Sequence, residues 1–309
     1  MRYFDLHCDT MLTCQYKNIP LRDNELHISM KKAEAIDTFV QCYAVFLHDS
    51  LRGEKAVECF DQVADRLVQE VEENRDVLTL CQKPGDLQSL SRHGAILTVE
   101  SAAALGGDLK NLEDWKKRGV KMCTLTWSGE NELGRGVLSE GTTGLTDFGR
   151  EVVKEFEKAG ILADISHASP ELFWDVVEIA TRPLVASHSN AKEICGHPRN
   201  LTDEQFDAIL KTDGLVGLNF YDAFLNDDES KAGMEDILRH AEHLLALGGE
   251  DHLAMGGDMD GSTMPQDMKD GLAAIPRLYE LFLRHYSQTV TDKIFYDNAA
   301  RFFTQYAAL

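Results

Sequence analysis

Eight short apolar runs of the kind that forms β-strands alternate with stretches of helical periodicity along the chain. The runs lie near residues 2–6, 38–46, 94–99, 120–126, 161–166, 183–187, 214–220 and 253–257. Between them apolar residues recur every three or four positions, as in 57–71 and 234–245, which is typical of helices that bury one face. Strands that alternate with helices in this way predict an α/β fold with a parallel sheet.

Capping residues mark the ends of several of these helices. Thr202 is followed three positions later by Gln205, which is a capping-box pattern, and Ser169 precedes Pro170 as the start of another helix. Gly160 is typical of a helix end. These signals place helix boundaries between the apolar runs and support the alternation.

No Pro- or Ser-rich linker, low-complexity tract or repeat divides the chain. Eight strand–helix units in one stretch favour a single domain over residues 1–309, a (β/α)₈ TIM barrel, over a doubly wound sheet. Residues 128–144 carry five glycines without clear periodicity. Two interpretations of that segment stay open: a lid over the barrel and a plain surface loop.

The composition fits a folded protein and argues against several partners. Of 309 residues 43% are hydrophobic and 27% charged, and 31 basic against 52 acidic residues give a formal charge of −21. Such a charge repels phosphate backbones and anionic lipid, so neither nucleic acid nor a membrane is an expected partner. The seven cysteines include no CxxC pair, and no basic, apolar leader or long apolar segment is present, so we expect a cytoplasmic protein.

The first apolar run carries polar residues at alternate positions: Asp5, His7 and Asp9. Strand alternation predicts that all three point into the barrel, with Leu6 and Cys8 on the opposite face. Buried polar side chains are costly without a partner, and a divalent metal is a simple partner for imidazole beside carboxylate. On its own this pattern fits a hydrogen-bonded core histidine equally well.

Four more candidates, Glu100, His167, His188 and Asp258, each come directly after one of the apolar runs. The carboxyl ends of barrel strands meet at one face, where catalytic residues converge. Three histidines and three carboxylates at that face exceed the needs of one tetrahedral site. They indicate two metal ions that share a bridging carboxylate and a bridging hydroxide.

These motifs resemble the membrane dipeptidase (renal dipeptidase) family, a zinc-dependent branch of the amidohydrolase superfamily. The resemblance is carried, in chain order, by Asp5-x-His7-x-Asp9, Val99-Glu100-Ser101, Asp164-Ile-Ser-His167, Ser187-His188-Ser189 with Arg199-Asn200, Gly257-Asp258-Met-Asp260-Gly261 and Asp297-Asn298-Ala-Ala-Arg301. The resemblance extends over essentially the whole chain. Within the family, the chain is similar to a soluble, bacterial-type member. It implies a metal-dependent hydrolase that cleaves dipeptides with a free C-terminal carboxylate.

The resemblance implies two zinc ions per chain. Five ligands are divided between the ions with one shared carboxylate: His7 and Asp9 for one ion, His167 and His188 for the other, and Glu100 as the bridge. A two-fold dimer is a further expectation.

Two residues outside the ligand set have implied roles in the reaction. Asp258 would take the proton as the metal-bridging hydroxide attacks the peptide bond, and would return it to the leaving amine. Arg199 would pair with the free C-terminal carboxylate, because the planar guanidinium fork suits a carboxylate.

One position departs from the mammalian-type pattern of the family. Those members have a histidine after the fourth strand that holds the substrate carbonyl, whereas this chain has Trp127. Its indole offers one N–H and a large apolar face, so we expect it to line the substrate pocket without replacing a cationic imidazole. Tyr221, after the seventh run, is a second candidate for substrate contact.

The remaining histidines have simpler interpretations. His240 and His243 belong to a surface-type helix pattern and are expected to be solvated, and His197 is expected to pack in a turn before Arg199.

Two alternatives to the dipeptidase stay open. One is another amidohydrolase activity on an N-acyl amino acid, a lactone or a deaminase substrate, and the other is a metal-binding protein that has lost catalysis.

Overall fold

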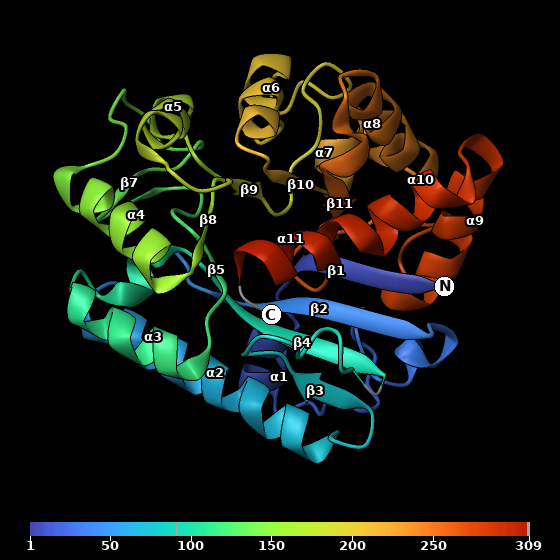
Figure 1. Ribbon diagram of the computed structural model, residues 1–309, viewed down its shortest axis with the longest axis horizontal. Coiled ribbons are helices and arrows are strands. Elements are labelled where there is room, and N and C mark those ends of the chain that lie inside the picture. Colours follow the sequence, from blue (N-terminus) through green and yellow to red (C-terminus); the bar gives the residue numbers. More distant parts are fainter. Residues whose placement is uncertain (91, 308–309) are drawn as a thin grey trace.

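The computed structural model describes residues 1–90 and 92–307 and contains a closed barrel of eight parallel strands (Figure 1). Strand β1 pairs with β2 on one side and with β11 on the other, which closes the ring. In their order around the barrel the strands are β1 (Arg2–Cys8), β2 (Thr38–Phe46), β4 (His93–Glu100), β5 (Met122–Thr124), β8 (Leu162–Asp164), β9 (Val185–Ala186), β10 (Leu215–Leu218) and β11 (Leu253–Met255). The predicted (β/α)₈ barrel and its eight strands are confirmed.

Helices surround the barrel and bury their apolar faces against it (Figure 1). They are α1 (Thr10–Lys17), α2 (Glu54–Glu73), α3 (Leu112–Arg118), α4 (Asp147–Ala159), α5 (Pro170–Ile179), α6 (Asp203–Lys211), α7 (Asp222–Leu225), α8 (Met234–Ala246), α9 (Ile275–His285), α10 (Gln288–Asp292) and α11 (Asn298–Tyr306). None of the helices in the described part of the chain combines the length and the hydrophobicity that a membrane span requires.

The predicted helix caps are present. Thr202 and Gln205 form a reciprocal capping box at the start of α6, and the Ser169 side chain accepts the Leu172 N–H at the start of α5. Gly160 ends α4 in the left-handed conformation. The loops that leave the barrel strands therefore enter the following helices at fixed positions.

Helix α11 closes one end of the barrel. Each barrel strand contributes at least one side chain to a buried cluster, such as Phe4, Ile96 and Leu215, and this cluster also contains Phe302 and Phe303 of α11. The rings of Phe4 and Phe303 lie 5.3 Å apart. Because this end is filled with apolar side chains, polar chemistry is left to the other end, where the strands terminate.

Three short strands were not predicted. Strand β3 (Leu78–Leu80) pairs with the first residues of β4, beside the barrel. Strands β6 (Glu130–Asn131) and β7 (Gly134–Arg135) form a hairpin within the glycine-rich segment 128–144.

The segment 128–144 is held to the barrel at several points. The Val137 N–H donates to the His167 carbonyl over 2.8 Å, and the Arg135 guanidinium donates to the Ser139 carbonyl over 2.6 Å and pairs with Glu171. These bonds fix the hairpin against the start of α5. The hairpin is thus bonded to the barrel top, whereas residues 140–143 of the same segment are exposed.

A bulge in β1 overturns the predicted alternation of its side chains. Asp5 aligns with Gln41 and Cys8 with Tyr43, so three steps along β1 match two along β2. As a result Leu6 packs in the barrel interior, whereas Cys8 packs in the cluster between the strands and the helices. Strict alternation holds only up to the bulge, and the side chains that follow it are re-aimed.

Candidate metal centre and active site

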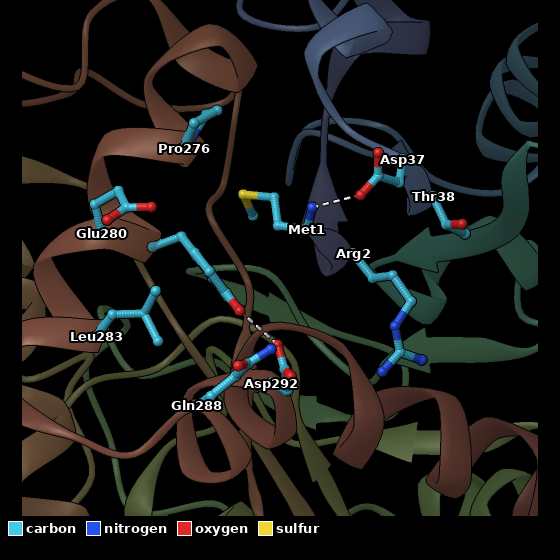
Figure 2. Close-up of a pocket in the computed structure, with 10 residues that line it drawn as sticks. Met1, Arg2, Asp37, Thr38, Pro276, Glu280, Leu283, Gln288 and Asp292 are labelled. Atoms are coloured by element: carbon cyan, nitrogen blue, oxygen red, sulfur yellow. Dashed lines mark hydrogen bonds and ion pairs between the residues drawn. The ribbon is translucent and has the colours of Figure 1, made fainter.

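Two large cavities lie at opposite ends of the barrel. One, of about 720 Å³, is formed by the starts of β1 and β2 with α9 and α10 (Figure 2). Four of its polar groups pair with one another: the Met1 amino group with Asp37 at 2.6 Å, and the Tyr279 hydroxyl with Asp292 at 2.6 Å. The other, of about 660 Å³, lies where the barrel strands end, and it contains the predicted site residues.

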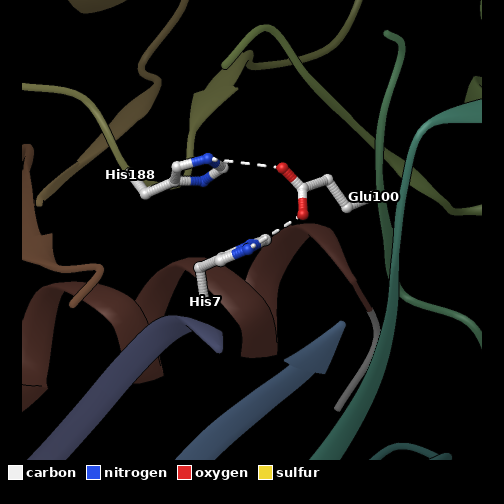
Figure 3. Close-up of side chains that lie close together, drawn as sticks. All are labelled: His7, Glu100 and His188. Carbon is white, nitrogen blue, oxygen red and sulfur yellow. Dashed lines mark ion pairs between the residues drawn. The ribbon is translucent and has the colours of Figure 1, made fainter. Parts of the chain in front are cut away.

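Glu100, the last residue of β4, stands at the centre of the site. Its Oε1 lies 2.9 Å from His167 Nε2 and 3.7 Å from His188 Nε2, whereas its Oε2 lies 3.4 Å from His7 Nε2. Figure 3 shows His188 and His7 approaching the two different oxygens of this carboxylate. The carboxylate thus lies between His7 on one side and His167 with His188 on the other.

Several buried ligand atoms have no conventional partner. His7 Nε2 and Asp9 Oδ1 make no hydrogen bond in the described structure, and His7 Nε2 lies 3.8 Å from Asp9 Oδ2. His167 Nε2 and His188 Nε2 face each other at 2.9 Å, a contact that requires a proton or a cation between them. Buried polar atoms without partners are costly, so this donor set fits divalent cations.

A buried hydrogen-bond chain fixes the orientation of His188. The Ser187 hydroxyl donates to Asp164 Oδ2 over 2.5 Å and lies 2.7 Å from His188 Nδ1. A hydroxyl has one proton, so Ser187 accepts from His188 Nδ1–H while it donates to the carboxylate. The lone pair of His188 is therefore on Nε2, the nitrogen that faces Glu100.

The chain turns sharply where it leaves the strands at this site. His167, Asp258 and Asp260 all have left-handed backbones, with φ of 67°, 56° and 65°. Gly261 supplies space next to them, because a Cβ there would lie 1.9 Å from Asp9 Oδ2 and 2.6 Å from Asp258 Oδ1. A glycine at this position keeps a cradle open between the two carboxylates.

Charge interactions and burial shift the pKa values of the ligand groups. Burial opposes ionisation of Glu100, but His7 and His167 lower its pKa below the usual range. Burial likewise disfavours the charged form of His7, and the Glu100 and Asp9 carboxylates nevertheless raise its pKa. Burial lowers the pKa of His167 to about 4 and raises that of Asp9 to about 6. Neutral His167 and ionised Glu100 are the forms that bind metals.

Asp258 lies beside the ligands with its own hydrogen-bond partner. Its Oδ1 is 4.0 Å from His7 Nε2, and its Oδ2 accepts a 3.3 Å hydrogen bond from Asn219 Nδ2. The Asn219 Oδ1 accepts the Tyr221 N–H, so the amide is oriented with its NH₂ toward Asp258. Burial raises the pKa of Asp258 to about 7, which suits a group that both takes and returns a proton near neutral pH.

The three candidate substrate residues all line the 660 Å³ cavity: Arg199, Trp127 and Tyr221. Arg199 is 4% exposed, donates to the His188 carbonyl over 3.2 Å and keeps its Nε without a partner. Burial lowers its pKa to about 10, so the guanidinium stays cationic at neutral pH. The Tyr221 ring contacts Phe224, with ring centroids 4.6 Å apart.

Two sequence interpretations are corrected near the site. Asp5 does not join His7 and Asp9, because its carboxylate accepts hydrogen bonds from Tyr3, Gln41, the His7 N–H and the Gly257 N–H. His240 is not solvated: it is fully buried on α8, where it accepts the Ala191 N–H and bonds the Leu225 carbonyl. In the sequence His240 has polar neighbours, which is typical of an exposed helix face. In the folded chain two segments that are distant in the sequence, those of Ala191 and Leu225, cover its ring.

Sequence reasoning also missed functional neighbours. Asn219 touches Asp258, Ser187 touches His188, and Phe46 and Leu138 line the cavity. Ser187 is the last residue of its apolar run and Asn219 the last but one of its own, close to the signal that identified the histidines, so both could have been found. His197 packs in its turn as expected, because its Nδ1 accepts the Arg199 N–H, and it also lines the cavity.

Comparisons with known proteins agree with this arrangement. The sequence pattern of the membrane dipeptidase family, peptidase family M19, matches residues 1–309. An uncharacterised protein from the pqqA 5′ region of Klebsiella pneumoniae is 36% identical over 237 residues, which are 72% of this chain and 87% of that protein. Dipeptidase tcpJ of Claviceps purpurea is 24% identical over 97% of this chain and 72% of its own length.

Solved structures of family members superpose on the whole chain. Dipeptidase AC, a metallopeptidase of family M19, has a TM-score of 0.93 at 28% identity, over 100% of this chain and 99% of its own. A metallopeptidase from Rhodobacter sphaeroides, liganded with a phosphinate mimic of the dipeptide L-Ala-D-Ala, has a TM-score of 0.91 at 27% identity, over 99% of both chains. The chain belongs to the membrane dipeptidase family and is a hydrolase of the metallodipeptidase type.

Proposed function

We propose that this enzyme hydrolyses the peptide bond of dipeptides with a free C-terminal carboxylate and uses two zinc ions. The observation that carries the proposal is Glu100, whose two oxygens face different histidines in a cavity that also holds Arg199. The phosphinate mimic of L-Ala-D-Ala bound by the Rhodobacter sphaeroides relative supports a dipeptide as the substrate class.

The ligand set fits two zinc ions. His7 and Asp9 would hold one ion, His167 and His188 would hold the other, and Glu100 would be shared between them. Imidazole and carboxylate are common zinc ligands, and Ser187 holds His188 in the tautomer that zinc requires. When bound, a pair of divalent ions lowers the pKa of a shared water and so supplies a nucleophile near neutral pH.

Asp258 performs the proton transfers. Its carboxylate accepts the proton of the attacking water and later donates it to the nitrogen of the leaving amine. Asn219 orients the carboxylate for both steps through its 3.3 Å hydrogen bond to Oδ2. Burial raises the pKa of this carboxyl group and so favours its uptake of the proton.

Arg199 binds the C-terminal carboxylate of the substrate and restricts its length. It is the one Arg or Lys among the described residues that line the cavity, and it is nearly buried. A charge-assisted pair with a carboxylate is favourable there, because the site is shielded from water. A longer peptide has no carboxylate at this distance from the scissile bond, so it leaves a buried cation unpaired.

The test is hydrolysis of a panel of dipeptides in L-L and L-D forms by protein stripped with a chelator and titrated with Zn²⁺. We expect activity that saturates near two zinc ions per chain, a loss of kcat of at least about 10²-fold in Asp258→Asn, and little cleavage of dipeptide C-terminal amides. Asp23→Asn, an exposed carboxylate, is the matched control. Activity on N-acyl amino acids or lactones in place of dipeptides would assign a different amidohydrolase reaction, and silence with two metals bound would indicate lost catalysis.

A further inference from the structure

The cavity has an apolar wall that has no role in the proposed reaction. Phe46, Trp127 and Leu138 form this wall, and the Phe46 and Trp127 rings pack edge to face with centroids 4.9 Å apart. Leu138 is 58% exposed, and Phe46 and Trp127 are half-buried. Covering apolar surface that is left open inside a cavity is favourable, because it removes this surface from water. The wall therefore offers a binding surface for an apolar side chain.

Barrel topology places the Phe46 side of this wall opposite the substrate carboxylate site. Arg199 follows β9 and Tyr221 follows β10, whereas Phe46 ends β2, which is four strands from β9 in the ring of eight. Trp127 follows β5, which lies two strands from β2 and two from β9. Its ring packs on that of Phe46, and its centroid lies 6.4 Å from that of His167. A dipeptide whose C-terminal carboxylate pairs with Arg199 and whose peptide bond lies over Glu100 thus extends its N-terminal residue toward the wall.

We propose that the apolar wall selects dipeptides with a large apolar residue at the N-terminal position. This inference rests on the proposed function and names its substrate class. Among the described residues that line the cavity, the cationic side chain Arg199 is on the far side, so an acidic N-terminal side chain has no cation to pair with at the wall. A glycine at that position leaves the wall uncovered.

The experiment compares two mirrored series, Xaa-Ala and Ala-Xaa, with Gly, Asp, Leu and Phe as Xaa, at saturating Zn²⁺. We expect kcat/KM for Phe-Ala and Leu-Ala to exceed that for Gly-Ala by at least about tenfold, since side-chain differences of this size in an apolar pocket change kcat/KM by one to two orders of magnitude. Asp-Ala should be the poorest of the Xaa-Ala substrates, and the Ala-Xaa series should show a smaller dependence on side-chain size.

Two variants connect this preference to the wall. Trp127→Ala should reduce the Phe-Ala to Gly-Ala ratio of kcat/KM to within about threefold of unity, and Leu138→Ala should reduce it in part. Because Leu138 is exposed at the rim, its truncation does not threaten folding. The matched controls are Trp174→Ala and Leu247→Ala, which remove exposed side chains outside the cavity and should leave the ratio at the wild-type value.

The outcomes separate the two proposals. A ratio near unity in the wild-type enzyme, or a ratio that neither wall variant changes, overturns the inference while the dipeptidase activity stands. A preference that appears in the Ala-Xaa series and responds to Trp127→Ala also overturns it, because the substrate then lies in the reverse direction. If no dipeptide is cleaved, the proposed function itself fails, and the inference fails with it.

Discussion

Gly261 leaves space beside two carboxylates of the candidate metal site. Its backbone conformation accepts alanine, but a Cβ would lie 1.9 Å from Asp9 Oδ2 and 2.6 Å from Asp258 Oδ1. We expect Gly261→Ala to fold normally and to bind Zn²⁺ at least about tenfold more weakly, since displacement of a ligand carboxylate disrupts the coordination geometry. Competition with a chromogenic chelator measures the affinity.

Gly196→Ala is the matched control for this prediction. Its backbone φ is also outside the left-handed region, and its Cβ would meet nothing closer than Asp227 Oδ1 at 3.7 Å. This variant should bind Zn²⁺ with wild-type affinity. Wild-type affinity in Gly261→Ala as well would show that the space beside Asp9 has no role in holding the metal.

At the scale of residues, the sequence predicted which side chains meet at the candidate site better than it predicted the hydrogen bonds around them. Strand ends in a barrel converge, so Glu100, His167 and His188 could be placed together from their position after apolar runs alone. Asp5 could not be excluded, because the bulge in β1 depends on how that strand aligns with β2. The hydrogen bond of Ser187 to His188 joins adjacent residues, yet its direction depends on Asp164, which lies on another strand.

Helix α8 shows how an element far from the metal ligands supports the loops of the site. Its His240 ring accepts the Ala191 N–H over 3.1 Å and bonds the Leu225 carbonyl over 3.1 Å, so it connects the loops after β9 and β10. A neutral ring with its proton on Nε2 satisfies both partners. Protonation of Nδ1 would break the bond to Ala191, which makes this contact sensitive to acid.

The pH dependence of stability should report this contact. Burial lowers the pKa of His240 from 6.5 to about 4, so the folded state binds the proton less well than the unfolded state. The stabilisation is complete above pH 6.5 and is lost as the pH falls toward 4, by about 2 kcal/mol at pH 5. We expect His240→Gln to lose less stability than wild type between pH 7 and pH 5, as measured by urea unfolding.

The exposed His285 on α9 provides the control for this measurement. His285→Gln should lose the same free energy of unfolding between pH 7 and pH 5 as wild type does. If His240→Gln behaves like His285→Gln, titration of the buried ring makes no contribution to acid sensitivity.

At the scale of elements, the sequence reveals an element more readily than its place in the fold. Helices such as α2 and α8 extend over several turns, so their apolar stripes are visible in the sequence. Strand β3 has three residues, as many as the predicted barrel strands β5, β8 and β11, but it pairs only with the start of β4 and lies beside the barrel, so the count of eight barrel strands left no place for it. The β6–β7 hairpin depends on contacts of Arg135 with distant groups, including Glu171, that no local pattern contains.

For the molecule as a whole, acidic charge and metal binding are connected. The chain has a formal charge of −21, and Asp9, Glu100 and Asp258 are held close together in a nearly buried site. Bringing three carboxylates out of water and next to one another opposes folding unless protons or cations compensate. The arrangement therefore requires positive charge between these groups at neutral pH. Among the three imidazoles His7 supplies part of this charge, because the Glu100 and Asp9 carboxylates raise its pKa, whereas burial lowers the pKa values of His167 and His188 and keeps them neutral.

Stability should consequently depend on zinc. A ligand that binds only the native state stabilises it by RT ln(1 + [L]/Kd), which is about 2.7 kcal/mol per site at a hundredfold excess over Kd. We expect the Tm of chelator-treated protein to rise by several degrees on addition of Zn²⁺ but not of Mg²⁺, which prefers six oxygen ligands. Calorimetry of Glu100→Gln should show a much smaller rise, whereas the exposed-site control Glu113→Gln should match wild type. An equal rise in Glu100→Gln would mean that zinc stabilises the protein somewhere other than this site.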